Sequence, residues 1–380
     1  MNKIAKTLTI VLFFGIMLAM PIITLLAPKE EFSDVENRNL AILPKFSLEN
    51  VKDRSYMKGL ETYLSDHFIG RSDWIGLKTD LEIATGKKEI NDVFVLNEKL
   101  IEKFSNINYI EVDKSIEAIN NFASKTDKEI FFMLAPTAAG IYSDELPANS
   151  PSNDQKAFID EVYSKLNKDT VTTLDVFDSL SSTQSEYIYY RTDHHWTTLG
   201  AYYAYATAIN QLGSKPLSLN SYEIEHASNE FLGTLYSKVI FENIPKDTID
   251  FFHFKNGFKV KSVTVQTGRE VNEYKDMYFR DYLTKKDKYS SFLGNNQPIV
   301  TVKTDMKEDK KILIIKDSYA HCFVPFLTQH YSEITMIDMR YINTDINNLI
   351  ELEDYEQILF LYNASSFSKD ENKKKLNFTK

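Results

Sequence analysis

Residues 191–200, RTDHHWTTLG, hold the side chains best suited to chemistry in this sequence. Asp193 stands two residues before His195, and a carboxylate so placed can orient an imidazole ring and stabilise its protonated form. A general base that takes a proton from a serine needs both effects. Thr197 can cap the helix that follows, whose apolar positions end at Gly213. We therefore expect Asp193 as orienter and His195 as base, on the rigid lead-in to a helix.

A serine in a suitable setting stands far downstream. Residues 311–316, KILIIK, form a short apolar run that predicts a buried strand, and they lead into Asp317-Ser318-Tyr319-Ala320 and a helical pattern. Ser318 is thus expected on a strand-to-helix turn, where backbone N–H groups and the helix dipole suit an alkoxide or a developing oxyanion. The order of such residues differs among unrelated serine hydrolases, so their separation is no obstacle.

Apolar runs alternate with helical patterns around this cluster. Strands are predicted at residues 129–135, 171–176, 311–316, 334–338 and 357–362. This alternation predicts an α/β fold with a mostly parallel sheet covered by helices on both faces. Residues 214–305 mix aromatic, charged and Gly/Asn positions without a clear period, and we interpret them as an inserted irregular or β segment.

Ligands of open α/β sheets bind beyond the carboxyl ends of the strands. Three polar segments follow predicted strands, namely Pro136-Thr137, Asp317-Ser318 and Asn363-Ala364-Ser365, and topology predicts that they converge. Further candidates for oxyanion or substrate contacts are Asn363, Tyr319, Trp196 and Thr137.

Other interpretations of these residues stay open. Asp193, His194 and His195 are possible metal ligands, but a zinc site needs more ligands than this spacing supplies, so we expect no metal and no cofactor. Asp317-Ser318 is also a suitable helix cap. Cys322 falls one helical turn after Ser318, which favours a small core residue over a nucleophile.

Length, charge and cysteine content narrow the class of protein. A chain of 380 residues with 43% apolar content can bury a large core. Its net charge of -10 argues against non-specific nucleic-acid binding, and we expect no nucleic-acid partner. A single cysteine excludes an intrachain disulfide.

The N-terminus indicates the compartment. Residues 7–28 carry no charge and are long enough to span a bilayer, with Lys3 and Lys6 before them and Glu30-Glu31 after them. We expect a cytoplasmic tail at 1–6, an uncleaved anchor at 7–28, a juxtamembrane helical segment at 29–104 and an extracytoplasmic domain at 105–380. A cleaved signal peptide is the alternative.

Several of these segments together resemble the DHHW family, named for the tetrapeptide found here at 193–196. Through that family the chain is similar to the SGNH-like polysaccharide O-acetyltransferases of alginate and bacterial cellulose acetylation. The resemblance rests on the segments Glu36-Asn37-Arg38 with Pro44, Asp66-His67-Phe68 with Arg71, Pro136-Thr137, Asp193-His194-His195-Trp196, Phe231 to Tyr236, Asp317-Ser318-Tyr319-Ala320 and Tyr362-Asn363.

The resemblance implies a circularly permuted SGNH enzyme with Asp193, His195 and Ser318 as its triad. It also implies an acetyl donor, a multispanning membrane-bound O-acyltransferase, and an exported polysaccharide as acceptor. In the family, the residue two positions before the serine is usually glycine, and here it is Lys316. A side chain at this position puts in doubt the close approach of the backbone that is expected before the nucleophile. A carbohydrate esterase with the same triad and a catalytically silent, anchored polysaccharide-binding scaffold are the alternative functions.

Overall fold

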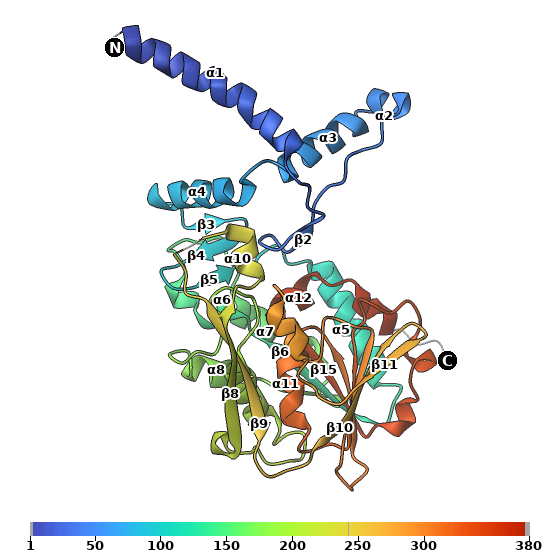
Figure 1. The fold of residues 1–380 in the computed structure, drawn as a ribbon. Coiled ribbons are helices and arrows are strands. Elements are labelled where there is room, and N and C mark those ends of the chain that lie inside the picture. The colour runs from blue at the N-terminus through green and yellow to red at the C-terminus, as the bar shows by residue number, and fades with distance from the viewer. Residues whose placement is uncertain (1–2, 242, 377–380) are drawn as a thin grey trace. The chain divides into compact units, whose positions relative to one another are not determined.

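The computed structural model describes residues 3–241 and 243–376. The chain divides into two compact units. One contains the residues up to 91 together with 236–243, and the other contains residues 92–235 together with those from 244 onward. Figure 1 labels the elements of both units.

The first unit begins with the apolar helix that the sequence predicts. The span Ile4–Leu26 has a mean hydropathy of 2.5, and it is the one helix in the described part of the chain that is long and apolar enough to cross a membrane. A helix of this length covers roughly 35 Å. The elements of this unit are α1 (Lys3–Leu26), β1 (Phe32–Ser33), β2 (Arg38–Asn39), α2 (Leu48–Lys52), α3 (Ser55–Asp66), α4 (Arg71–Ala84) and β3 (Glu89–Ile90).

An ion-pair network joins two motifs of this unit that lie apart in the sequence. The Arg38 guanidinium donates two hydrogen bonds to the Asp66 carboxylate, at 2.6 and 2.9 Å. Arg38 and Arg71 each donate through Nε to Glu36, at 2.9 and 2.8 Å. The hydrogen bond from Arg38 lowers the pKa of Asp66 to about 2. Paired guanidinium and carboxylate groups of this geometry fix the chain path between β2 and α3.

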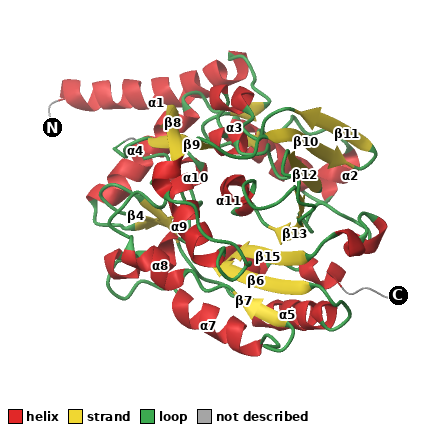
Figure 2. Cartoon of the chain, turned by 90° about the horizontal axis from the view of Figure 1, so that it is seen from below, coloured by secondary structure: helices red, strands yellow, loops and turns green. Residues whose placement is uncertain are grey.

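The second unit is built on an eight-stranded sheet in the order β11-β10-β12-β14-β13-β15-β6-β7. Five neighbouring strands run parallel, and Figure 2 shows four of them in the order β13, β15, β6 and β7. The parallel strands are β14 (Glu333–Ile337), β13 (Lys311–Lys316), β15 (Gln357–Asn363), β6 (Glu129–Ala135) and β7 (Val171–Thr173). These are the five predicted strands, and the mixed α/β fold with a mostly parallel sheet is confirmed.

The predicted insertion contributes to this sheet as well. Three of its strands continue the sheet in antiparallel fashion beyond β14, namely β12 (Ile299–Thr304), β10 (Val260–Thr267) and β11 (Glu270–Tyr274). Two more, β8 (Tyr222–Phe231) and β9 (Asp247–Phe254), pair as a separate antiparallel ribbon. The strands of this region depend on pairing with distant strands, and its aperiodic sequence does not predict where they lie.

Helices cover the sheet because its strands are apolar on both sides. Every residue of β15 is buried, as are five of the six in β13. On one face, Phe122 of α5 (Tyr109–Ala123) packs edge-on against Phe360, and Tyr163 of α7 (Gln155–Lys165) packs against Phe132. The other helices of this unit include α6 (Ala138–Ile141), α8 (Phe177–Ser182), α9 (Thr198–Ala208), α11 (Ala320–Leu327) and α12 (Ala364–Lys369), and β4 (Val93–Val95) pairs with β5 (Leu100–Glu102). Helix α10 (Thr234–Val239) has its first two residues in this unit and the others in the first unit.

The chain direction reverses in the middle of the parallel strands. The β13–α11–β14 crossover runs toward one edge of the sheet, and β6–α7–β7 runs toward the other. Right-handed crossovers in opposite directions place α11 and α7 on opposite faces. A crevice forms where such a reversal occurs, beyond the carboxyl ends of the strands. Ser318 follows β13 at this end, and Asn363 closes β15 beside it.

Candidate active site

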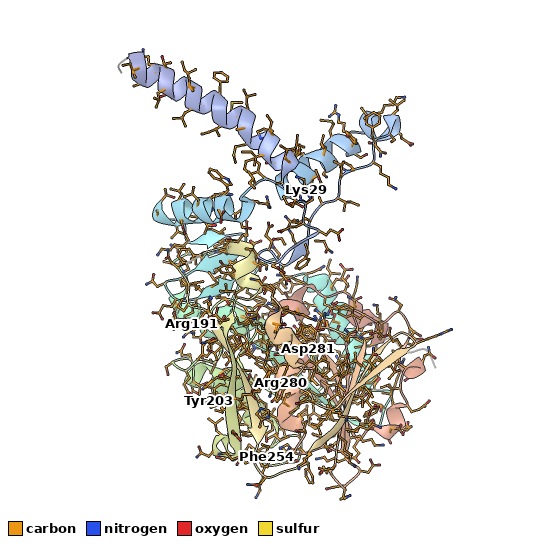
Figure 3. The ribbon with its side chains drawn as sticks, viewed as in Figure 1. Lys29, Arg191, Tyr203, Phe254, Arg280 and Asp281 are labelled. Atoms are coloured by element: carbon orange, nitrogen blue, oxygen red, sulfur yellow. The ribbon has the colours of Figure 1, made fainter. Side chains whose placement is uncertain are left out.

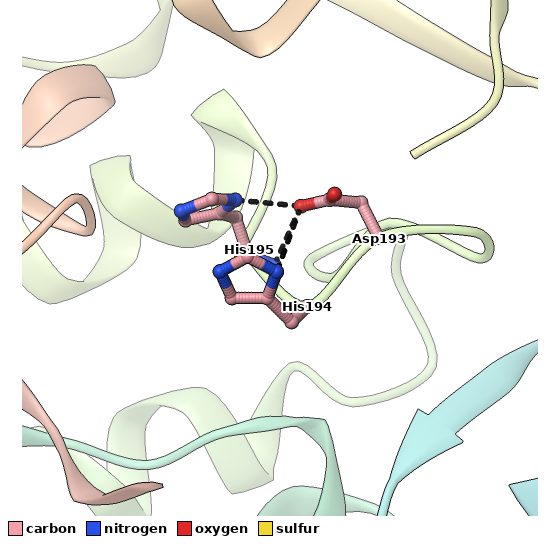
Figure 4. Close-up of side chains that lie close together, drawn as sticks. All are labelled: Asp193, His194 and His195. Carbon is pink, nitrogen blue, oxygen red and sulfur yellow. Dashed lines mark hydrogen bonds and ion pairs between the residues drawn. The ribbon is translucent and has the colours of Figure 1, made fainter. Parts of the chain in front are cut away.

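Asp193, His195 and Ser318 form one hydrogen-bonded chain. The Nε2 atom of His195 lies 2.7 Å from the Ser318 Oγ, and its Nδ1 lies 2.6 Å from Asp193 Oδ1. Asp193 and His195 are buried, at 2% and 5% exposure, whereas Ser318 is half-buried. Figure 4 shows the Asp193 carboxylate beside the two imidazoles of this segment, with one oxygen facing both rings. Because Asp193 accepts from Nδ1, the His195 tautomer that leaves Nε2 free can accept a proton from the serine.

The Asp193 carboxylate is held by four hydrogen bonds. Oδ1 accepts from the His195 backbone N–H at 3.0 Å in addition to the ring. Oδ2 accepts from the backbone N–H and the hydroxyl of Thr234, at 2.8 and 3.0 Å. Burial alone would raise the pKa of this carboxyl, but the neighbouring imidazoles and the Thr234 amide outweigh it and hold the pKa below its usual range. Asp193 is therefore a fixed anion beside the candidate base.

A second buried carboxylate fixes the backbone just before Asp193. Asp247, at the start of β9, accepts from the backbone N–H groups of Arg191 and Thr192, at 2.7 and 2.8 Å. Tyr187 donates its hydroxyl to the same side chain at 2.5 Å. Figure 3 labels Arg191 at this point. Asp247 thus accepts from two consecutive backbone N–H groups that would otherwise be buried without a partner, and it holds the loop in one conformation.

The turn that carries Ser318 has its own carboxylate support. Asp317 Oδ1 accepts from the Tyr319 N–H at 2.9 Å, and Oδ2 accepts from the Asn363 backbone and side-chain amides, both at 2.8 Å. These bonds connect the end of β13 to the end of β15. The serine is therefore positioned by two neighbouring strands before α11 begins.

Tyr289 stacks directly on the candidate base. Its ring lies 3.7 Å from the His195 ring at an interplanar angle of 8°, and its hydroxyl donates to the Ser318 carbonyl at 3.0 Å. Tyr289, Thr234 and Asp247 all come from the region interpreted as an insertion, and sequence reasoning did not identify them. The one available signal was the segment Phe231 to Tyr236, which contains Thr234.

The other predicted contact residues serve mainly to support the site. Trp196 is fully buried and donates its indole N–H to the Tyr319 carbonyl at 3.0 Å, so its ring is not available for contact with a substrate. Tyr319 is equally buried, and its hydroxyl donates to the His194 carbonyl at 2.5 Å. Thr137 is engaged with Gln155, whose Oε1 accepts from the Thr137 backbone N–H at 2.7 Å.

Asn363 also differs from the role expected for it. Its Nδ2 group donates to Asp317 at 2.8 Å and to Ser366 at 2.9 Å, so both amide hydrogens are engaged. Its Oδ1 caps α12 by accepting from the Ser366 backbone N–H. An amide committed in this way orients the serine turn and does not reach toward a substrate.

Lys316 does not interrupt the hydrogen-bonded chain. Its side chain is fully buried, with Nζ at 2.7 Å from His321 Nε2 and at 3.5 Å from Asp338 Oδ2. Burial lowers the pKa of Lys316 to about 8, and Asp338 opposes that shift. Asp338 is itself paired with Arg340 at 2.6 Å. The side chain found at the usual glycine position is accommodated in a polar cluster of its own.

Asp193, His194 and His195 are also a group that can hold a metal ion. One ligand atom from each lies within 4.8 Å of the others. The same atoms already have partners, because His194 Nδ1 lies 2.7 Å from the Thr234 hydroxyl and both nitrogens of His195 are hydrogen-bonded. With three ligands engaged elsewhere, this donor set fits a proton relay better than a tetrahedral zinc site.

Comparisons with known proteins identify the family. The model of the DHHW family, described as DHHW protein, matches residues 76–337, and the chain belongs to this family. The crystal structure of a DHHW family protein from Eubacterium siraeum superposes with a TM-score of 0.64 at 25% identity, covering 77% of this chain and 98% of that one. The comparison with curated proteins returns no match.

Two further solved structures resemble the chain. Bacillus cereus PatB1, solved both alone and with a sulfonyl adduct, has a TM-score of 0.64 at 21% identity and covers 76% of this chain, with 99% and 98% of its own length matched. At that identity it shows a shared fold. The O-acetyltransferase domain of Pseudomonas putida AlgJ, at 13% identity, covers 73% of this chain and 92% of its own, and its TM-score of 0.46 is too low to support a functional argument.

Proposed function

We propose that this DHHW protein is an extracytoplasmic O-acetyltransferase that moves acetyl groups through Ser318 onto hydroxyls of an exported polysaccharide. The observation that carries the proposal is the hydrogen-bonded chain from Asp193 through His195 to Ser318 at the reversal point of the sheet. The family resemblance supports the acetyl and polysaccharide parts of the proposal.

The first half-reaction loads the enzyme. His195 Nε2 takes the Ser318 hydroxyl proton as Oγ attacks the carbonyl carbon of an acetyl donor, and Asp193 stabilises the imidazolium. Collapse of the tetrahedral intermediate breaks the bond to the leaving group, which takes the proton from His195. Ser318 then carries the acetyl group as an ester.

The second half-reaction reverses these roles. His195 takes a proton from a sugar hydroxyl, whose oxygen attacks the acetyl ester of Ser318. The intermediate releases Oγ, which recovers the proton from His195. The products are an O-acetylated sugar and the free serine.

The developing oxyanion needs hydrogen-bond donors at the serine turn. The Asn363 amide is engaged, and the Tyr319 N–H donates to Asp317. The Ser318 N–H has no acceptor among the residues that the structure describes, and we assign it as an oxyanion donor. The backbone at Ser318 is held in place by Asp317, whose carboxylate accepts from Tyr319 and from Asn363.

An esterase that uses the same residues is the second candidate. Ser318 is half-buried, so water has access to the site, and water in place of a sugar hydroxyl gives hydrolysis. Lys316, which departs from the family glycine, does not favour the silent scaffold, because its side chain contacts His321 and Asp338 and not the residues of the hydrogen-bonded chain.

We further propose where the catalytic domain lies and which protein supplies its acetyl groups. Residues 7–28, as an uncleaved anchor, hold residues 29–104 beside the membrane and a catalytic domain, residues 105–380, outside the cytoplasm. A multispanning membrane-bound O-acyltransferase supplies the acetyl group across that membrane. Helix α1, which is long and apolar enough to span a membrane, supports the anchor.

Product analysis tests the reaction type. The full chain in detergent is incubated with p-nitrophenyl acetate and a panel of neutral and acidic oligosaccharides, and the sugars are examined by mass spectrometry. Acetylated oligosaccharide that forms with the native chain and not with Ser318→Ala supports the transferase. Release of p-nitrophenol with acetate as the only acetyl product, across the panel, would support the esterase instead.

The pH dependence of ester turnover reports on His195. Burial and the charge of His194 lower the pKa of His195 to about 4, against the opposing effect of Asp193. A general base must be unprotonated, so a lowered pKa keeps it active to lower pH. We expect kcat/KM for p-nitrophenyl acetate to be constant above about pH 5 and to fall by half near pH 4. His194→Gln removes one of the lowering influences and should move this midpoint upward.

Circular dichroism at each pH provides the control, because it separates loss of fold from protonation of the base. A midpoint at or above the ordinary histidine value of 6.5, with the fold intact, would contradict this electrostatic description of His195.

A further inference from the structure

Exposed apolar side chains are concentrated in one short stretch of this chain. Outside α1, the described part of the chain exposes twenty large apolar side chains, and thirteen of them lie between residues 32 and 81. Water-exposed apolar area costs about 25 cal/mol per Å², and clusters of it usually mark a surface that something covers.

Helix α4 exposes three of its five large apolar residues. On its inward side Ile75 and Ile83 are half-buried, Gly76 lies near Ile240, and the Thr79 hydroxyl donates to the Val239 carbonyl at 2.7 Å. Its outward face carries an apolar stripe at spacings of three and four residues, formed by Trp74, Leu77 and Leu81, which are 53%, 50% and 60% exposed. An exposed stripe of this kind usually marks a surface that something covers.

The segment before α3 has a similar surface. Its exposed apolar side chains are Ile42, Leu43, Phe46 and Leu48. A cavity of about 240 Å³ in the same unit has Phe68 and Ile69 in its wall but is lined mainly by charged and polar residues, among them Glu36, Asp66 and Arg71. The apolar residues thus lie on outer surfaces of separate elements and do not form a groove shaped for one protein segment.

Contacts between the end of α1 and the segment before α4 fix where α4 lies relative to the membrane. Thr24, in the last turn of α1, is buried, and its hydroxyl accepts from the Ile69 backbone N–H at 3.4 Å. Lys29, labelled in Figure 3, donates to the Thr24 carbonyl, and its ammonium lies 5.9 Å from the centre of the Tyr63 ring. Residue 69 precedes the start of α4 by two positions. When α1 spans a bilayer, the start of α4 therefore lies where α1 leaves the hydrocarbon.

We propose that α4 lies in the interfacial region of the phospholipid bilayer, with Trp74, Leu77 and Leu81 toward the acyl chains. Tryptophan favours this region, and apolar residues beside a lysine such as Lys78, whose head can reach the phosphates, are typical of interfacial helices. This contact orients the unit against the membrane in addition to the tether that α1 provides. It depends on α1 as an anchor and is independent of the acetyl chemistry.

The two tryptophans of the chain allow a direct test. Trp74 is half-exposed, and Trp196 is fully buried in the other unit. The full chain is reconstituted into phosphatidylcholine vesicles whose acyl chains are brominated either near the headgroup or near the chain ends, and tryptophan emission is recorded. We expect headgroup-proximal bromine to remove roughly half or more of the Trp74 emission, and more than deep bromine removes. Trp74→Phe supplies the Trp196 background, which should be unaffected.

A second variant and a flotation assay make the result decisive. The pair Leu77→Gln and Leu81→Gln should reduce the bromine quenching of Trp74. If the chain floats with the vesicles while Trp74 stays open to aqueous iodide and unaffected by bromine, the surface faces water or is kept for a protein partner, and the proposal fails. A chain that does not float overturns it too. Ester turnover, measured on the same samples, reports the proposed function separately.

Discussion

Replacement of Ser318 by alanine is expected to lower kcat/KM for p-nitrophenyl acetate by roughly 10⁴- to 10⁶-fold. Oγ is the atom that His195 Nε2 contacts at 2.7 Å, and a methyl group can neither give up a proton nor form an ester. The fold should be unchanged, because the Ser318 side chain is half-buried in the turn that follows β13.

The matched control is Ser164→Ala. Ser164 lies exposed on α7, where its hydroxyl donates to the Glu161 carbonyl at 2.7 Å. Its loss should leave turnover within about twofold of the native chain, in line with other surface substitutions. Ester turnover by Ser318→Ala at more than about a tenth of the native rate would mean that another group is the nucleophile.

Asp193→Asn is expected to lower kcat by about 10⁴-fold with little change in KM. An asparagine amide can donate to His195 Nδ1, and the proton then sits on Nε2, where it prevents the ring from accepting the serine proton. The asparagine carbonyl can still accept both hydrogen bonds from Thr234, which should hold the loop although the bond from the His195 backbone N–H is lost. A decrease in kcat of less than about tenfold would show that the carboxylate is not needed to set the tautomer.

The substitution Gly233→Ala is expected to displace the Asp193 carboxylate while the aspartate itself is retained. A Cβ at this position would lie 2.2 Å from the Asp193 Cβ and 2.4 Å from its Oδ2, so the Asp193 side chain must shift. A misplacement of about 1 Å can cost roughly 100-fold in rate, and we expect at least that in kcat. Gly76→Ala is the control, since the nearest atom to its Cβ is 3.7 Å away.

The sequence is informative about the sheet because parallel strands buried on both faces are continuous apolar runs. The run KILIIK became β13, and QILFLYN became β15, within a residue of their predicted ends. The strand predicted at 171–176 ends at Thr173 instead, and the Phe177 N–H donates to Asp175 Oδ1 where α8 begins. A local turn of this kind can shorten an element without altering its apolar pattern.

The site was predictable where its residues are neighbours in sequence and less so elsewhere. Asp193 and His195 share one turn, and the strand-to-helix signal around Ser318 is local. Asp247 and Tyr289 contribute through long-range contacts, and an aspartate or tyrosine in an aperiodic segment gives no local signal of such a contact. The amide of Asn363 was expected to face the substrate, and its engagement with Asp317 depends on two strands being adjacent.

Covalent labelling of Ser318 tests the central claim most directly. The full chain is treated with an aryl sulfonyl fluoride or with p-nitrophenyl acetate at neutral pH, and the adduct is located by intact mass and peptide mapping, beside His195→Ala and Ser318→Ala. We predict one adduct per chain, on Ser318, that forms at least about 100-fold more slowly in His195→Ala and not at all in Ser318→Ala. An adduct on another residue, or a folded chain that acquires none, would contradict the assignment of Ser318 as the nucleophile.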